Sequence, residues 1–181
     1  MKLFEYKGIR PSIDPTAYIQ DGVKICGDVT IEKDVSIWYN CTLRGDMSSI
    51  TIKEGTNVQE LTTIHNDFNT PTIIGKNTTI GHGCIIHGCI IGDGCMIGMG
   101  STILNNCVIP DGCLVAANSL VVKTDGFEPG MMIMGNPAKA VRPLDQKNKD
   151  YLVRNAKVYQ NLAKEYKESV KEIQPIKIQL L

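Results

Sequence analysis

A chain of 181 residues in which 43% of the side chains are apolar is long enough to bury the core of one main domain. Its 19 basic and 19 acidic residues cancel, so the overall charge favours neither nucleic acid nor a membrane surface as a partner. The first ten residues carry charges where a secretory signal needs an unbroken apolar stretch, and no run of about 18 apolar residues follows. We therefore expect a cytoplasmic protein.

The most regular feature of the sequence is an aliphatic residue at about every sixth position. Neither an α-helix nor a simple alternating strand produces this period, whereas a hexapeptide repeat with small residues and Gly, Asp or Asn corners is the signature of a parallel β-helix. The positions that we expect to point inward are Ile13, Ile19, Ile25, Ile31, Ile37, Leu43, Ile52, Val58, Ile64, Ile74, Ile80, Ile85, Ile91, Ile97, Ile103, Ile109, Val115 and Val121.

The seven cysteines fit the same pattern. Their number is odd and no CxxC pair occurs, so neither a closed disulfide framework nor a zinc ribbon is indicated. Most of them stand four residues after an inward aliphatic residue, a position that the repeat otherwise fills with Val, Ser or Thr. We expect them to be small packing residues of the core, because free cysteine buries readily.

This repeat resembles the hexapeptide-repeat superfamily. The resemblance implies an all-β solenoid, a left-handed parallel β-helix with three hexads in each triangular coil, and usually a trimer. The handedness comes from the resemblance alone, since the spacing does not determine it.

A different pattern begins after the last hexad. From about residue 149, apolar and aromatic side chains recur at steps of three and four, which predicts an amphipathic helix that Pro175 prevents from continuing. We expect residues 1–143 to form the solenoid domain and residues 144–181 to form a C-terminal helix and tail that pack on it. The expected stripe contains Tyr151, Leu152, Asn155, Tyr159, Leu162, Tyr166 and Val170.

The irregularities of the repeat all lie near the histidines. With three hexads in a coil, Leu43, Ile64 and Ile85 fall on the same side of successive coils. This count requires an insertion after Leu43, another at residues 66–73, and a hexad shortened to five residues at 80–84. Irregularity in a regular repeat is tolerated most often where function needs it.

The three histidines of the chain are His65, His82 and His87. His65 directly follows an inward residue and must point outward, while His82 and His87 are expected at corners. Coils stack about 4.8 Å apart, so His65 and His87 can reach one metal ion, whereas His82 lies on the preceding side and needs partners from another chain. Three imidazoles without a fourth protein ligand are typical of a catalytic zinc site. The alternative is three isolated surface residues.

Three stretches carry a closer resemblance: WYNCTLRGDMSSITIKEGTNVQELTTIH, PTIIGKNTTIGHGCIIHGC and GNPAKAVRPL. They are similar to the gamma-class carbonic anhydrases, and the similarity covers nearly the whole chain. It implies reversible hydration of CO2 to bicarbonate by metal-bound hydroxide in a homotrimer. The implied metal ligands are His65, His87 and, from the adjacent subunit, His82. We expect one divalent ion per subunit, Zn²⁺ first, with Fe²⁺ and Co²⁺ also compatible.

The same resemblance implies further site residues. Arg44 and Asp46 match the family's interface ion pair, and their alternative is a surface turn. Asn57 and Gln59 match residues beside the metal-bound water, where Gln59 orients the nucleophile, and their alternative is a pair of solvated strand polars. Tyr159 matches a tyrosine from the C-terminal helix, and its alternative is a packing role.

The sequence also departs from the best catalysts of that family. Met47 stands where they carry a glutamate, and their acidic loop beyond the first histidine is absent, which leaves only Asp67 nearby. We therefore expect slow proton export and weak activity. Two other functions stay open: an acyl-coenzyme A-dependent acyltransferase that uses one histidine as a general base, and a non-catalytic trimeric scaffold that keeps a metal site for stability.

Overall fold

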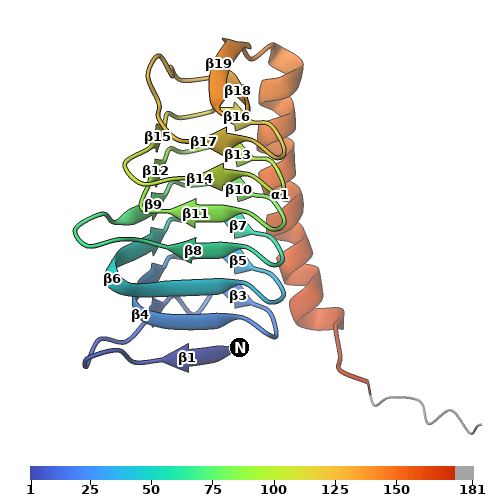
Figure 1. The fold of residues 1–181 in the computed structure, drawn as a ribbon. Coiled ribbons are helices and arrows are strands. Elements are labelled where there is room, and N and C mark those ends of the chain that lie inside the picture. The colour runs from blue at the N-terminus through green and yellow to red at the C-terminus, as the bar shows by residue number, and fades with distance from the viewer. Residues whose placement is uncertain (174–181) are drawn as a thin grey trace, which may run out of the picture.

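The computed structural model describes residues 1–173, and its architecture is that of the predicted left-handed parallel β-helix with a C-terminal helix (Figure 1). The strands stack into three faces, and the chain turns a corner between one face and the next. The predicted tail at residues 174–181 lies outside the described residues.

Two of the faces share long strands that bend around a corner. Face A contains β1 (Lys2–Phe4), the first halves of β4 (Lys24–Ile31) and β6 (Thr42–Ile52), β8 (Thr63–His65), β11 (Ile85–His87), β14 (Thr102–Ile103) and β17 (Leu120–Val121). Face B contains β2 (Ser12–Ile13), the second halves of β4 and β6, β9 (Thr72–Ile74), β12 (Ile90–Ile91) and β15 (Val108–Ile109).

The third face, face C, ends in an antiparallel hairpin. It contains β3 (Tyr18–Ile19), β5 (Ser36–Ile37), β7 (Asn57–Val58), β10 (Thr79–Ile80), β13 (Met96–Ile97), β16 (Leu114–Val115), β18 (Met131–Gly135) and β19 (Ala138–Pro143). The hairpin of β18 and β19 occupies the segment where the hexad period breaks. It pairs with β16 and so closes this end of the stack.

The core is the column of side chains that the hexads turn inward. The aliphatic residues from Ile25 to Val121 that we placed inward are buried, with one exception. Six of the seven cysteines are buried with them, while Cys26, which directly follows Ile25, is half-buried. Burial raises the pKa of Cys41, Cys89 and Cys95 to about 12, so these thiols stay protonated at neutral pH, as expected of packing residues.

The exception is Ile85, and the prediction for it is wrong. Ile86 is fully buried and Ile85 is 46% exposed, so the shortened hexad lies between Ile86 and Ile91. Its corner contains Gly88, whose φ is +53° and where a Cβ would lie 2.3 Å from the side chain of Asn105. Adjacent isoleucines at 85–86 and 90–91 made both assignments compatible with the sequence.

Helix α1 (Gln146–Ser169) begins slightly before the predicted start and lies along face C, from the β18–β19 hairpin back toward β3 (Figure 1). Asp145 caps it by accepting a hydrogen bond from the backbone N–H of Asn148. Leu152, Ala156 and Ala163 are buried. Val170 is 45% exposed beyond the last turn, so it does not belong to the packed stripe.

An aromatic cluster fixes α1 on the solenoid. The Trp38 ring meets the rings of Tyr159 and Tyr166 edge-on, with centroids 5.7 and 5.0 Å apart. Tyr18 adds a third edge-on contact to Trp38. Such pairs add to the hydrophobic gain of burial, so the helix is held where its polar residues face β7 and β10.

No helix within residues 1–173 combines the length and the apolar character that a membrane crossing requires.

Candidate metal centre

His65 and His87 lie side by side on face A. Each directly follows a buried isoleucine, and the two residues pair in register between β8 and β11. His87 is therefore an outward strand residue like His65, and its predicted corner position is wrong. Nδ1 of His65 lies 3.1 Å from Nε2 of His87. Two nitrogens bound to one tetrahedral zinc at about 2.0–2.1 Å are about 3.3 Å apart, so the pair fits two ligands of one ion.

The remaining nitrogen of each ring has a hydrogen-bond partner. Nε2 of His65 is 3.0 Å from Oδ1 of Asp46, and Nδ1 of His87 is 2.5 Å from Oδ1 of Asn105. Asn105 donates in turn to Asp67 at 2.5 Å. A partner of this kind holds the proton on one ring nitrogen and leaves the other as an electron-pair donor. The two other nitrogens are the ones that converge, and Nδ1 of His65 also lies 3.3 Å from Nη2 of Arg44.

Arg44 and Asp46 form an ion pair within one chain, with Nη1 and Oδ2 2.6 Å apart. Burial pushes the pKa of Asp46 upward, but the hydrogen bonds from Arg44 and His65 outweigh it, so that the pKa lies below its usual value. Asp46 is therefore an anion at neutral pH and can accept from His65. We call Arg44, Asp46, His65, His87 and Asn105 the pair half.

His82 occupies the corner between β10 and β11, as predicted. It stands between Gly81 and Gly83, and its Nδ1 lies 2.6 Å from Oε2 of Glu60, one coil away. Among residues 1–173, no three His, Cys, Asp or Glu side chains gather closely enough to hold a metal ion. His82 is thus separate from the histidines of face A within one chain.

Asn57 and Gln59 lie beneath α1, beside the His82 corner. Gln59 donates to Asn57 at 3.2 Å, and Asn57 donates to Thr79 at 2.8 Å. Thr79 donates to Asn155 of α1 at 3.1 Å. Both predicted amides are buried, so they are not solvated strand polars, and this chain of hydrogen bonds fixes the orientation of the Gln59 side chain.

A cavity of about 180 Å³ connects these residues with His82, and its lining includes Gln59, Asn155 and Tyr159. Tyr159 packs on Trp38, as in its alternative role, and it also lines the cavity, while its part in the site stays a prediction. Burial first, and then the charge of Glu60, raise the pKa of Tyr159, so its phenol stays protonated at neutral pH. We call Asn57, Gln59, Glu60, His82 and Tyr159 the corner half.

The structure thus brings the predicted residues into two groups, and it adds two residues that sequence reasoning missed. Glu60 precedes His82 by 22 residues and Asn105 follows His87 by 18. Both separations equal about one coil, since His87 pairs with His65 at 22 residues. The stacking of coils was therefore the signal that could have revealed both partners.

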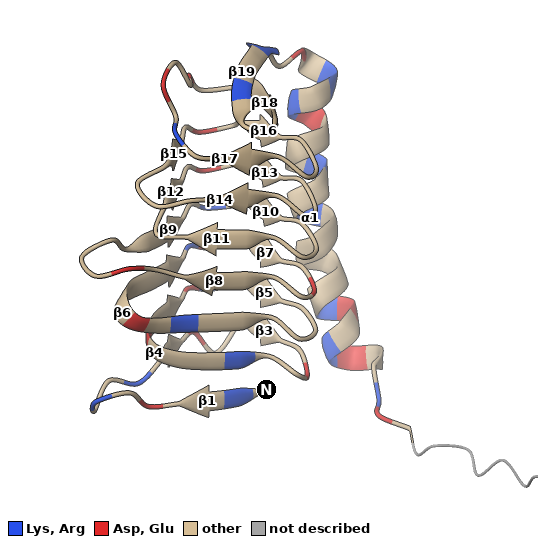
Figure 2. Ribbon diagram, in the orientation of Figure 1, with Lys and Arg blue, Asp and Glu red and all other residues tan. Residues whose placement is uncertain are grey.

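Apolar side chains surround both halves. Leu104 and Val122, which are 38% and 42% exposed, continue the outward column of His65 and His87, and Ile85 stands beside it. Strands β11, β14 and β17 carry no Lys, Arg, Asp or Glu (Figure 2). At the His82 corner, Leu61 and Met99 are 67% and 57% exposed. Exposed apolar side chains that gather in this way are typical of surfaces that contact another molecule.

Comparisons with known proteins agree with this architecture. Residues 71–105 and 88–123 match the family of bacterial transferase hexapeptide repeats. The mitochondrial gamma carbonic anhydrase 2 of Arabidopsis thaliana is 38% identical over 93% of this chain and 63% of its own length. A second Arabidopsis relative, gamma carbonic anhydrase 1, is covered over 58% of its length, so the chain spans about three fifths of these plant proteins.

Two further matches cover almost the full length of both partners. The carnitine operon protein CaiE of Shigella flexneri is 35% identical over 98% of this chain and 90% of its own. The crystal structure of a hexapeptide transferase family protein from Anaplasma phagocytophilum superimposes with a TM-score of 0.87 and 40% identity, over 91% of this chain and 97% of the other. The chain therefore belongs to the hexapeptide-repeat family, among the proteins that resemble gamma-class carbonic anhydrases.

Proposed function

We propose that this protein is a metal-dependent carbonic anhydrase of the gamma class that hydrates CO2 reversibly to bicarbonate between the subunits of a homotrimer. His65 and His87 of one subunit and His82 of the next are its metal ligands. One observation carries the proposal: an acceptor, Asp46, Asn105 or Glu60, holds one nitrogen of each of the three imidazoles and so orients the other nitrogen for a ligand. A divalent ion supplies Lewis acidity and, when bound, lowers the pKa of a coordinated water to about 7.

Sharing between subunits is supported by what a single chain lacks. The pair half offers two converging nitrogens, and no third ligand of the described residues joins them. The corner half offers one imidazole, whose side chain is 46% exposed. Apolar residues beside each half supply surface for an interface. Three equal interfaces in a closed ring then complete three sites.

The other residues of the corner half position the reactants. Gln59 donates to Asn57, so its side-chain carbonyl oxygen is left to accept a hydrogen bond from a water in the cavity and to orient it. Burial keeps this amide from exchanging its partners with solvent. Tyr159 is a neutral hydrogen-bond donor at the wall of the same cavity. These contacts place the nucleophile and leave proton export to groups nearer the surface.

Proton export is the weak point of this site. Met47 follows Asp46 in the part of β6 where the pairing with β4 shifts and is 38% exposed, so the position that would suit a mobile carboxylate holds a thioether. Asp67 accepts a hydrogen bond from Asn105, the residue that in turn contacts His87, so Asp67 is not a freely moving carboxylate. Turnover therefore depends on buffer to carry protons, and we expect it to be slow.

The two other functions make different demands on the same residues. An acyltransferase needs one histidine as a general base, and it gives no reason for three histidines that each have an acceptor on one nitrogen. A non-catalytic scaffold would keep the metal but has no use for the oriented Gln59. The choice of Zn²⁺ over Fe²⁺ or Co²⁺ and the cytoplasmic location stay predictions, and the Arabidopsis relatives are named as mitochondrial.

The proposal is tested by metal analysis, light scattering and stopped-flow CO2 hydration on protein loaded with each of the three ions. We expect a trimer with about one ion per subunit and slow, buffer-dependent hydration that is lost in His82→Ala. A monomer that holds stoichiometric metal would contradict the shared site. Metal-loaded trimer without hydration at any buffer concentration would leave the scaffold as the better account.

A further inference from the structure

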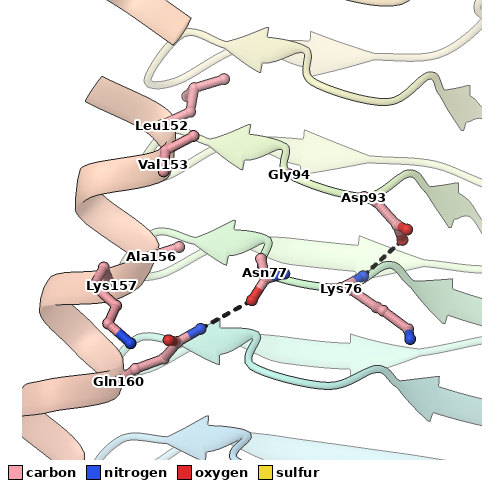
Figure 3. Close-up of a pocket in the computed structure, with 9 residues that line it drawn as sticks. All are labelled: Lys76, Asn77, Asp93, Gly94, Leu152, Val153, Ala156, Lys157 and Gln160. Carbon is pink, nitrogen blue, oxygen red and sulfur yellow. Dashed lines mark hydrogen bonds between the residues drawn. The ribbon is translucent and has the colours of Figure 1, made fainter. Parts of the chain in front are cut away.

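A second groove lies on the opposite flank of α1 from the metal centre. Its volume is about 550 Å³, and it separates the helix from the corners between face B and face C (Figure 3). Tyr151, Asn155 and Tyr159 line the cavity beside His82, whereas Val153 and Lys157 line this groove. The two spaces therefore lie on different flanks of the helix, and nothing in the proposed carbonic anhydrase reaction uses the groove.

The groove exists because two successive corners meet the helix differently. At the first corner, Gln160 bridges the gap by donating to Asn77 at 2.9 Å and to the carbonyl of Gly55 at 3.1 Å. At the next corner stands Gly94, whose φ is +62° and where a Cβ would meet no atom within 4 Å. The helix residues Leu152, Val153 and Ala156 line the space beside this corner without filling it.

The walls of the groove are mostly apolar. Leu152 and Ala156 are buried, and Val153 is 74% exposed although it is a valine on an ordered helix. Figure 3 shows Val153 and Ala156 extending from α1 toward the solenoid, while the Lys157 side chain runs along the helix toward Gln160. An apolar wall with a few polar groups at its edge is the usual composition of a small-molecule site.

The polar groups at the edge are mainly donors. Lys157 has no carboxylate within 4.0 Å among residues 1–173. Asn77 uses its side-chain oxygen to accept from Gln160, which leaves its amide nitrogen as a donor. The carboxylate of Asp93 accepts from the backbone N–H of Lys76 (Figure 3). A ligand that satisfies the remaining donors must bring acceptors.

The charge of the helix points the same way. Helix α1 contains six Lys or Arg and three Asp or Glu residues, although the chain as a whole is neutral. Figure 2 shows basic positions distributed along the length of α1. An anion is therefore attracted to this side of the molecule.

We propose that this groove binds a small organic carboxylate with an apolar body, such as a medium-chain fatty acid. Its carboxylate contacts the ammonium of Lys157 and the amide of Asn77, and its chain lies on Val153 and Ala156. A monoanion fits better than a phosphate, because Lys157 is a single unpaired cation and Asp93 adds negative charge to the same groove.

The test is calorimetric titration of the full-length protein with octanoate. We expect one octanoate per chain, with octylammonium, octan-1-ol and octyl phosphate each binding more weakly. Lys157→Met should weaken octanoate by about fivefold, which is the upper end for an exposed ion pair. Lys147→Met, on the same helix but outside the groove, should leave binding unchanged.

Two variants that fill the groove test its location. Gly94→Asn should abolish saturable binding, because the new side chain occupies the groove. The variant should still fold, since asparagine tolerates a positive φ, as Asn77 does one coil earlier. Val153→Trp fills the space from the helix side and serves if Gly94→Asn folds poorly. Octanoate that binds equally well to a folded filled variant would overturn the proposal. Equal or tighter binding of octylammonium or octyl phosphate would overturn the ligand class.

Discussion

The pair half and the corner half of the metal centre are built to different degrees. In the pair half, two imidazoles converge to 3.1 Å, and Asp46 and Asn105 hold them from behind. In the corner half, His82 stands alone on a glycine-flanked corner, with a side chain that is 46% exposed and held by Glu60. Two ligands are therefore preformed in each chain, and the third becomes useful only on assembly.

The largest effect is expected from removing a ligand. His65→Ala, His87→Ala and His82→Ala should each lose stoichiometric metal, because binding depends on the complete set. All three side chains point away from the core, so thermal unfolding in the presence of a chelator should match the wild type. Metal analysis after gel filtration measures the difference. If His82→Ala keeps its full metal content while His65→Ala and His87→Ala lose theirs, the pair half binds the ion without a ligand from the partner subunit.

The second effect comes from the residues that hold the imidazoles. Asn105→Ala and Glu60→Ala should each weaken metal binding by about 10- to 100-fold, because the ring behind each ligand loses its orienting acceptor. Asn105→Asp keeps an acceptor at the same place and should restore most of the affinity. Competition with a chelator of known affinity gives the numbers. An unchanged affinity in both alanine variants would mean that these contacts are incidental.

Glu60 and Asn105 also show how far the sequence could be interpreted. The hexad period was sufficient to predict the solenoid, the inward residues and the outward direction of His65. Hydrogen bonds between coils depend on which residues stack, and that register shifts at every insertion. Ile85 was placed inward because two adjacent isoleucines satisfy the period equally well. A single-residue error there moved His87 from strand to corner, although both assignments kept it near His65.

The helix illustrates a second limit. Its apolar stripe was visible in the sequence, and Tyr159 was a candidate both for packing and for the site. The period of the helix does not reveal which solenoid residues it meets, because those contacts join segments far apart in the chain. The bond from Thr79 to Asn155 crosses 76 residues and had no local signal. The orientation of Gln59 depends on that contact and could not be predicted.

A smaller effect is expected from adding a carboxylate to the pair half. Met47→Glu places a proton acceptor beside Asp46 on an exposed side chain, so CO2 hydration at low buffer should rise by at least about tenfold. Metal affinity should not change, since the side chain of Met47 is not a hydrogen-bond partner of His65 or His87. At high buffer the two proteins should converge. Fast hydration by the wild type that is independent of buffer would show that another proton path exists.

The smallest effect is expected in the corner half from Tyr159→Phe. The ring keeps its edge-on contact with Trp38, so the free energy of unfolding should change by less than about 1 kcal/mol. Loss of one hydrogen-bond donor at the cavity should lower the hydration rate by about twofold to fivefold. Chemical denaturation and stopped-flow kinetics measure the two quantities. A large loss of stability with an unchanged rate would assign Tyr159 to packing alone.

The most direct test of the shared metal centre uses mixed trimers of His82→Ala and His65→Ala chains. One interface of such a ring joins the intact pair half of the first chain to the intact His82 of the second. We expect co-refolded mixed trimers to recover tight binding of at most one ion per trimer, while each variant alone binds none tightly. Mixed trimers that bind no more metal than the separate variants would contradict a site built from two subunits.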